Sequence, residues 1–181
     1  KKNIQLPTDK KFLLSVGRLT KQKNYNYLLN EIKNFLRSNS DFDLVILGDG
    51  EDRNIIKKKI SDFNMNDRIH ILGYKKNPYS YMLKASALIL CSLWEEVGFV
   101  IVEAALSNLL VFSSNCPNGP KEFLENGRAG FLFNTNEKNA LNNKIDKINS
   151  DNYKKKIYAK KNCLKYTKFR HFKVFSNILT A

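Results

Sequence analysis

The sequence predicts an α/β domain with a doubly wound parallel sheet of about six strands and extra helices at its C-terminal end. Short apolar runs recur along the chain, and each is followed by a polar segment that is compatible with a helix. These runs are nearly continuous rather than alternating, which is typical of parallel strands buried on both faces. A length of 181 residues with 43% hydrophobic residues suffices for one such domain with a full apolar core.

The elements follow one another in strand–helix order. Strands are predicted at residues 12–16, 44–47, 69–72, 88–91, 111–113 and 130–133, and the connecting helices at 25–36, 52–63, 78–84, 97–106 and 121–125. After residue 133 the strand-like runs stop, and helices are predicted at 137–148, 153–166 and 172–179. A single domain over 1–181 is therefore expected, with the sheet and its crossover helices at about 10–135 and C-terminal helices at about 136–181.

Cysteine and histidine usage excludes several classes of small protein. Cys91, Cys116 and Cys163 have no close spacing and there are two histidines, which argues against a disulfide framework or a zinc site. A reducing compartment is the simpler interpretation. No apolar run approaches the roughly 18 residues of a membrane-spanning helix, and the start lacks a hydrophobic signal segment. Because the chain begins without Met, we expect it to be a piece of a longer protein.

The strongly basic charge has two interpretations. With 31 Lys plus Arg against 17 Asp plus Glu, the formal net charge is +14, which attracts phosphate-bearing partners at long range. The 25 Lys, 6 Arg and 23 Asn also match the drift of an A/T-rich genome, and the lysine runs fall on predicted helices as solvated faces. An anionic membrane surface remains the alternative, because each lysine near it contributes about 1 kcal/mol. No cluster of Arg and aromatic residues indicates a nucleic-acid partner.

A glycine turn with two cations follows the first predicted strand. Gly17 is followed by Arg18, and Lys23 lies just before the next helix. Free backbone N–H groups at a helix start and two flanking cations form a site for a phosphate or diphosphate. The spacing matches neither a nicotinamide-binding glycine motif nor a P-loop. Taken alone, an ordinary surface loop is the competing interpretation.

Two carboxylates follow the fourth predicted strand. Glu103 is a lone carboxylate on an apolar helix that is expected to be largely buried, so it requires hydrogen-bond donors. A ribose diol and an internal Lys or Arg are equally good donors at this level of argument. Glu95 lies near the helix start, where it could accept from a second set of hydroxyls. The N–H groups of Gly98, Phe99 and Val100 are expected to point between the two carboxylates.

Other turns carry weaker signals. The turn 48–50 is expected to be structural, because its glycines allow a sharp bend and Asp52 could cap the following helix. Cys116, in a rigid turn without a histidine, is expected to be an inert thiol. His70 is expected to be a packed histidine rather than a general base, and His171 has no evident partner.

Taken in order, these motifs resemble the C-terminal domain of the GT-B retaining glycosyltransferases of family 4. The order and spacing match over about residues 10–135. The matching motifs are Val16-Gly17-Arg18-Leu19 with Lys23, Gly48-Asp49-Gly50, Leu72-Gly73-Tyr74, Glu95, and Glu103 followed by Ala104-Ala105. The resemblance implies a Rossmann-like half-domain that binds a nucleotide-diphosphate sugar, most simply a UDP-sugar, without a metal. The N-terminal acceptor domain of that architecture is not expected within this chain.

The resemblance also implies a role for each matching residue. Arg18 and Lys23, with Gly17, would hold the donor diphosphate, Glu103 the ribose hydroxyls, and Glu95 hydroxyls of the sugar. The base would lie against the backbone near Tyr74 and Lys75. The implied catalytic residues are Arg18, Lys23 and Glu95. This chain reads Glu95-Glu96-Val97-Gly98-Phe99 where the family commonly reads Glu-Gly-Phe-Gly, so the detailed sugar contacts differ.

The expected function is therefore donor binding in a retaining transferase. The sugar would be a hexose or N-acetylhexosamine, and the acceptor a bacterial surface glycan or lipid-linked glycan bound by the N-terminal domain. We expect a cytoplasmic location, with peripheral attachment to the inner face of the plasma membrane as an open question, and little transfer by the isolated domain. The alternatives are a nucleotide-sugar epimerase half-domain on the same scaffold and a non-enzymatic basic module for RNA or an anionic membrane.

Overall fold

A computed structural model describes residues 6–96 and 98–166, which form a six-stranded sheet with helices on both faces. All strand pairs are parallel, in the order β3-β2-β1-β4-β5-β6. This order is that of a doubly wound dinucleotide-binding fold, so the predicted fold class is confirmed. The strands are β1 (Lys11–Val16), β2 (Phe42–Leu47), β3 (Ile69–Ile71), β4 (Ala87–Leu90), β5 (Leu110–Ser114) and β6 (Phe131–Phe133).

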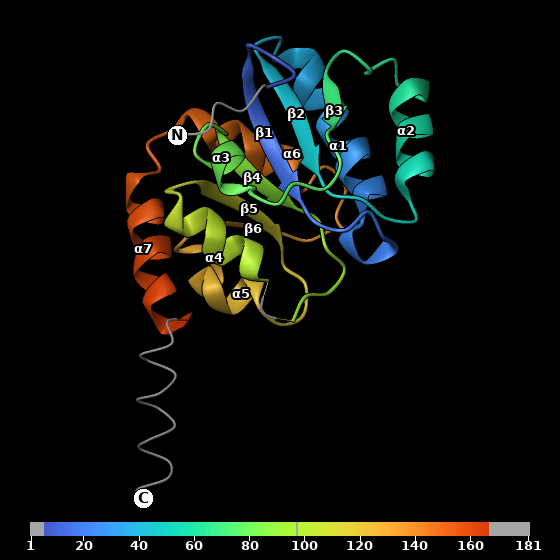
Figure 1. Ribbon diagram of the computed structural model, residues 1–181. Coiled ribbons are helices and arrows are strands. Elements are labelled where there is room, and N and C mark those ends of the chain that lie inside the picture. Colours follow the sequence, from blue (N-terminus) through green and yellow to red (C-terminus); the bar gives the residue numbers. More distant parts are fainter. Residues whose placement is uncertain (1–5, 97, 167–181) are drawn as a thin grey trace, which may run out of the picture.

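Helices cover the two faces of the sheet (Figure 1). The buried side chains form two apolar layers, one on each face. One layer packs α1 (Tyr25–Ser38), α2 (Arg53–Asp62) and α6 (Asn142–Ile145) against side chains such as Leu13, Leu44 and Phe112. The other packs α3 (Tyr79–Met82), α4 (Phe99–Leu106), α5 (Pro120–Phe123) and α7 (Tyr153–Cys163) against side chains such as Leu14, Leu88 and Val111. Alternate strand residues thus face opposite layers, as a sheet buried on both faces requires.

The loops after β1 and β2 cross each other at very close range. A Cβ atom on Gly48 would lie 1.8 Å from the carbonyl oxygen of Gly17, and one on Gly50 would lie 2.5 Å from that of Leu19. The N–H of Leu19 donates to the carbonyl of Asp49 at 3.0 Å, and the N–H of Gly48 to that of Gly73 at 2.9 Å. Only glycine permits this approach, so the predicted structural role of the turn is confirmed.

Several predicted helix limits are wrong for identifiable reasons. The predicted helix 137–148 is reduced to α6 and the 3₁₀ turn η3 (Asp146–Asn149), because Asn139 adopts a left-handed φ of 57°. The helix predicted at 121–125 ends at Phe123, since Glu125 is also left-handed. Asp52 occupies the N-cap position of α2, but its side chain makes no capping hydrogen bond. The predicted helix at 172–179 and His171 lie outside the described residues.

The C-terminal region departs in detail from its prediction as well. The predicted helix 153–166 consists of α7 followed by the 3₁₀ turn η4 (Leu164–Tyr166).

Two further short turns and one helix start lie elsewhere in the chain. A short 3₁₀ turn, η1 (Lys21–Lys23), precedes α1, and another, η2 (Glu125–Gly127), follows α5. The start of the predicted helix 97–106 also moves, because α4 begins at Phe99 with Gly98 as its N-cap at a φ of 64°.

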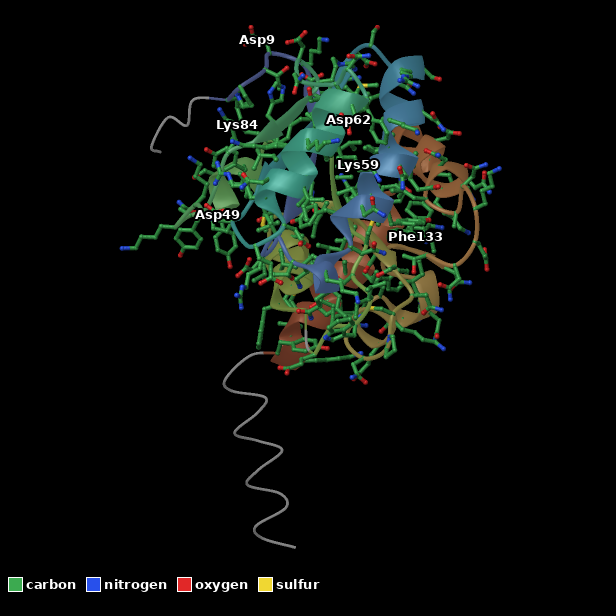
Figure 2. The ribbon with its side chains drawn as sticks, turned by 90° about the vertical axis from the view of Figure 1, so that its right-hand side faces the viewer. Asp9, Asp49, Lys59, Asp62, Lys84 and Phe133 are labelled. Carbon is green, nitrogen blue, oxygen red and sulfur yellow. The ribbon has the colours of Figure 1, made fainter. Side chains whose placement is uncertain are left out.

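Two lysines of the basic run on α2 have local partners. Lys58 pairs with Asp62 at 3.0 Å, and Lys59 donates to the side-chain oxygen of Asn26. Figure 2 labels Asp62 and Lys59 on this helix. His70 is packed, as predicted, with its Nε2 atom 3.4 Å from Oδ2 of the buried Asp43. Within the described ranges, no helix is long and apolar enough to cross a membrane.

Candidate functional site

Two adjoining cavities lie at the carboxyl edge of the sheet, where a doubly wound fold binds its ligands. Both are lined by the end of β1 and by the loops that follow it. One, of about 430 Å³, extends from β1 toward the loops after β2 and β3. The other, of about 580 Å³, extends toward η1 and the start of α4. They share Val16, Gly17, Arg18 and Glu103, so together they form one continuous cleft across the point where the strand order reverses.

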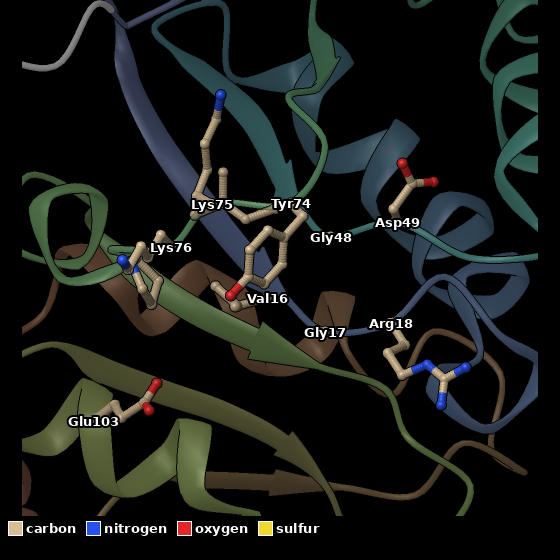
Figure 3. Close-up of a pocket in the computed structure, with 11 residues that line it drawn as sticks. Val16, Gly17, Arg18, Gly48, Asp49, Tyr74, Lys75, Lys76 and Glu103 are labelled. Carbon is tan, nitrogen blue, oxygen red and sulfur yellow. The ribbon is translucent and has the colours of Figure 1, made fainter.

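The structure brings all the sequence-predicted site residues to this cleft. Tyr74 and Lys75 line the smaller cavity, and Figure 3 shows the Tyr74 ring extending over the end of β1 while the Lys75 ammonium points away from Glu103. The larger cavity is lined by the residues that were predicted around a diphosphate and a sugar: Lys23, Glu95, Gly98, Phe99 and Val100. Gly17, Arg18 and Glu103 belong to both parts.

Lys23 and Glu95 form a buried ion pair. The Nζ atom of Lys23 lies 2.5 Å from Oε1 of Glu95, and the side chains are 17% and 7% exposed. The hydroxyl of Ser92 donates to the same oxygen at 2.5 Å. The roles predicted for Lys23 and Glu95 lie on different parts of a ligand, and their contact with each other was not predicted. Because an ammonium group has three donors, Lys23 can bind Glu95 and still donate to a ligand oxygen.

Two hydrogen bonds of Gln22 connect the turn η1 to the loop after β4. Its side-chain Nε2 donates to the carbonyl oxygen of Trp94 at 2.9 Å. Its backbone carbonyl oxygen accepts from the backbone N–H of Leu93 at 2.8 Å. Gln22 and Trp94 line the larger cavity and Lys76 lines the smaller one, and none of the three was a predicted site residue. The position of Gln22 between Arg18 and Lys23, within the predicted phosphate loop, was the sequence signal that could have indicated it as a site residue.

Glu103 lies at the junction of the two cavities without a protein partner. It is half-buried rather than largely buried, which corrects the sequence expectation, because this side of α4 faces the cleft. Within residues 6–96 and 98–166 its carboxylate makes no hydrogen bond or ion pair, so the alternative of an internal Lys or Arg partner is not found there. Partial burial raises the pKa of this carboxyl group. An unpartnered acceptor of this kind is suited to ligand hydroxyl groups.

Arg18 and the start of α4 supply positive potential to the cleft. Arg18 is exposed at the junction of the two cavities, where Figure 3 shows its guanidinium free of the labelled side chains. The N–H of Ile101 donates to the backbone carbonyl of Gly98, and it is the first N–H group of α4 with an acceptor among the described residues. The preceding N–H groups, those of Phe99 and Val100, are therefore available beside the larger cavity. A helix start of this kind favours a negatively charged ligand group.

Other reactive side chains near the cleft do not form a second site. Cys116 is buried, and burial raises the pKa of its thiol, which favours the inert protonated form. Among the described residues, no group of three or more His, Cys, Asp or Glu side chains could hold a metal ion. The arrangement therefore combines cations, helix N–H groups and two carboxylates around an extended cleft.

Comparison with known proteins identifies the family. A family model described as glycosyl transferases group 1 matches residues 1–165. The chain belongs to this glycosyltransferase family. It is 30% identical over 151 residues to the N-acetylgalactosamine-N,N'-diacetylbacillosaminyl-diphospho-undecaprenol 4-alpha-N-acetylgalactosaminyltransferase of Campylobacter jejuni, which covers 83% of this chain and 40% of that protein. It is 35% identical over 140 residues to the UDP-Gal:alpha-D-GlcNAc-diphosphoundecaprenol alpha-1,3-galactosyltransferase of Escherichia coli, covering 75% and 36% of the two chains.

Solved structures of glycosyltransferases share the fold. A mutant of Staphylococcus aureus TarM in complex with fondaparinux, alpha-GlcNAc-glycerol and UDP matches with a TM-score of 0.86 at 22% identity, over 95% of this chain and 36% of that one. The pneumococcal O-GlcNAc transferase GtfA, in complex with UDP and GlcNAc, matches with a TM-score of 0.81 at 17% identity, over 96% and 37%. The chain spans less than half the length of these proteins and corresponds to the C-terminal half of the GT-B fold.

Proposed function

We propose that this domain binds the donor of a retaining glycosyltransferase. The donor is a nucleotide-diphosphate sugar, UDP-linked, that carries a hexose or an N-acetylhexosamine. The acceptor is a bacterial surface-glycan or lipid-linked glycan, held by an N-terminal domain of the full-length protein. The observation that carries the proposal is the Glu103 carboxylate, which has no partner among the described residues and lines both cavities, as Arg18 does. An acceptor for a diol and a cation in one cleft fit the ribose and the diphosphate of such a donor.

Each part of the cleft then receives one part of the donor. The ribose hydroxyls donate to Glu103, and the base lies against the loop at Tyr74 and Lys75. The diphosphate lies between Arg18, Lys23 and the free N–H groups at the start of α4. The sugar lies toward Glu95, which accepts from its hydroxyls. The lining of the cleft supports this order, since Tyr74 and Lys75 line the smaller cavity only, and Lys23 and Glu95 line the larger one only.

The chemical role of these cations follows from the charge that develops during transfer. When the bond between the anomeric carbon and the diphosphate breaks, negative charge accumulates on the leaving diphosphate. Arg18, Lys23 and the N–H groups of Phe99 and Val100 would stabilise that charge. Loss of one such contact typically raises the barrier by about 3 kcal/mol. The sugar moves to an acceptor hydroxyl, so the acceptor domain supplies the other reactant and the isolated domain alone transfers little.

The relatives support the choice of acceptor. Two curated relatives at 30% and 35% identity are named as transferases acting on diphospho-undecaprenol-linked sugars. We therefore place the protein in the cytoplasm, at the inner face of the plasma membrane, where such acceptors are presented. Family membership favours transfer over both the epimerase and the basic-module alternatives.

The proposal is tested by titrating the chain with UDP, GDP, ADP and their common sugar conjugates, followed by NMR or by thermal shift. We expect one nucleotide series to stabilise the chain, and the effect to disappear in Glu103→Ala. Glu51→Gln is the matched control, because Glu51 is an exposed carboxylate at the same edge of the sheet that lines neither cavity. Unchanged affinity in Glu103→Ala would refute the assignment of the ribose to this residue.

A further inference from the structure

We infer that Ser92 is a positioning residue that fixes the carboxylate of Glu95 so that one oxygen, Oε2, is presented to the sugar of the donor. The inference rests on the proposed function, because it assumes that a nucleotide sugar occupies the larger cavity. It adds a residue to the site that lines neither cavity and acts only through Glu95.

The inference starts from a chain of hydrogen bonds that links β5 to the cleft. The hydroxyl of Ser114, in β5, donates to the backbone carbonyl of Ser92 at 2.6 Å. The hydroxyl of Ser92 then donates to Oε1 of Glu95 at 2.5 Å. Ser114 and Ser92 are each 1% exposed, and Glu95 is 6% exposed. A hydroxyl that is buried in this way and aimed at a carboxylate holds that carboxylate in one orientation.

Both donors to Glu95 use the same oxygen. Lys23 and Ser92 each lie 2.5 Å from Oε1, from the side of η1 and from the end of β4 respectively. None of the described residues donates to Oε2. A carboxylate can accept about four hydrogen bonds, so Oε2 of Glu95 can still accept a hydrogen bond. Glu95 also lines the larger cavity. A partly buried acceptor without a donor costs free energy, which a ligand hydroxyl would recover.

The backbone around Ser92 is held independently of its hydroxyl. Its carbonyl is bound by Ser114, and the N–H of the next residue, Leu93, donates to the carbonyl of Gln22 at 2.8 Å. Removal of the hydroxyl therefore leaves the loop in place and frees the Glu95 carboxylate to rotate about its terminal torsion. Lys23 alone does not prevent this rotation, because its ammonium group is at the end of a flexible stem.

The test compares a nucleotide with its own sugar conjugate on the same variants. The probes are UDP and UDP-N-acetylglucosamine, with UDP-galactose as a second sugar, titrated by calorimetry on the chain. Ser92→Ala is expected to leave UDP affinity unchanged and to reduce by about tenfold the ratio of UDP-sugar affinity to UDP affinity, the usual effect of one hydrogen bond to a charged group. Ser92→Thr, which keeps the hydroxyl, restores the ratio.

Ser113→Ala is the matched control. Ser113 is a neighbouring serine, 0% exposed, whose hydroxyl donates to the carbonyl of Ser114 and not to Glu95. Removal of the Ser113 hydroxyl is expected to leave the ratio of UDP-sugar affinity to UDP affinity unchanged. A loss of ratio in Ser113→Ala equal to that in Ser92→Ala would show a general packing effect and overturn the inference.

Glu95→Gln keeps the test decisive where Ser92→Ala does not fold. The side-chain oxygen of the glutamine can still accept from Lys23 and Ser92, but its NH₂ group takes the place of Oε2 and donates instead of accepting. The ratio is expected to fall as in Ser92→Ala. If UDP binds and depends on Glu103 while the ratio survives in either variant, the inference is wrong and the proposed function stands. If no nucleotide series binds the wild-type chain, the proposed function itself fails, and the inference with it.

Discussion

The ammonium of Lys23 lies 2.5 Å from Oε1 of Glu95, although 72 residues separate the two in the sequence. This pair joins the turn after β1 to the loop after β4, across the point where the strand order of the sheet reverses. Gln22 reinforces the junction with two further hydrogen bonds to the same loop. The larger cavity is therefore bounded by two loops that are hydrogen-bonded to each other.

Loss of the Lys23 side chain should destabilise the fold. Lys23→Met leaves the Glu95 carboxylate buried with Ser92 as its remaining described donor, and breaking a buried pair typically costs about 3 kcal/mol. Urea unfolding measures the loss. In the double variant Lys23→Met/Glu95→Gln the buried charge is gone, so part of the stability is expected to return. Equal losses in the single and double variants would contradict a paired carboxylate.

Gly48→Ala should be more damaging than the same change at another glycine with positive φ. Gly48 has a φ of 148°, and its new Cβ would meet the carbonyl oxygen of Gly17 at 1.8 Å. Gly127 has a φ of 96° with nothing within 4 Å of such a Cβ, so Gly127→Ala reports backbone strain alone, about 1 to 3 kcal/mol. We expect a larger loss for Gly48→Ala in thermal unfolding. Similar melting temperatures for the two variants would argue against the close loop crossing.

Glu103 should make the stability of the chain fall as pH rises. Its pKa is raised by burial in the folded chain, so the folded state binds a proton more tightly than the unfolded state. Stability is therefore lost as the pH rises from the ordinary carboxyl pKa through the raised value, and the loss is complete above it. Glu103→Gln should be more stable than wild type at pH 7, with a gain that shrinks toward pH 4. Melting curves from pH 4 to 7.5 test this, with Glu51→Gln as control.

Trp94 should report occupancy of the larger cavity. It is the single tryptophan of the sequence, is 49% exposed and lines that cavity only. A bound nucleotide sugar is expected to cover part of the indole and shift its fluorescence emission to shorter wavelength. The corresponding nucleotide without sugar should produce a smaller shift. Identical spectra with and without a bound nucleotide sugar would place the sugar elsewhere.

The cysteines should resist alkylation in the native chain. Cys91, Cys116 and Cys163 are buried, and burial raises the pKa of each thiol, so little thiolate is present at pH 8. Mass spectrometry after iodoacetamide treatment is expected to show no modification without denaturant and three modified cysteines in urea. Rapid labelling of Cys116 in the native chain would show that the turn after β5 is open.

The fold was predictable because its signal is repeated. Most strands are nearly continuous apolar runs, and the predicted and observed strand limits differ by at most two residues. The helix limits that failed depend on single backbone conformations. Asn139 and Glu125 adopt left-handed φ values, and periodicity carries no information about such residues.

The position of the site was predictable, but its internal contacts were not. Residues that follow parallel strands meet at one edge of the sheet, which brought Arg18, Tyr74 and Glu103 to one cleft. The pairing of Lys23 with Glu95 depends on side-chain conformations across two loops, and the sequence carries no record of these. The partial exposure of Glu103 depends on how α4 rotates toward the cleft, and the apolar sequence of a helix predicts its burial without showing which side faces a cleft.

The sharing of Gly17, Arg18 and Glu103 by the two cavities has a consequence for ligands of different length. A ligand fragment that fills one cavity contacts residues that also line the other cavity. If a second fragment is covalently joined to the first, its effective concentration in the other cavity is high. A nucleoside diphosphate and a free sugar should each bind more weakly as separate molecules than the proposed donor, in which they are joined. Once the bond between sugar and diphosphate is broken, this advantage is lost and the nucleoside diphosphate can leave.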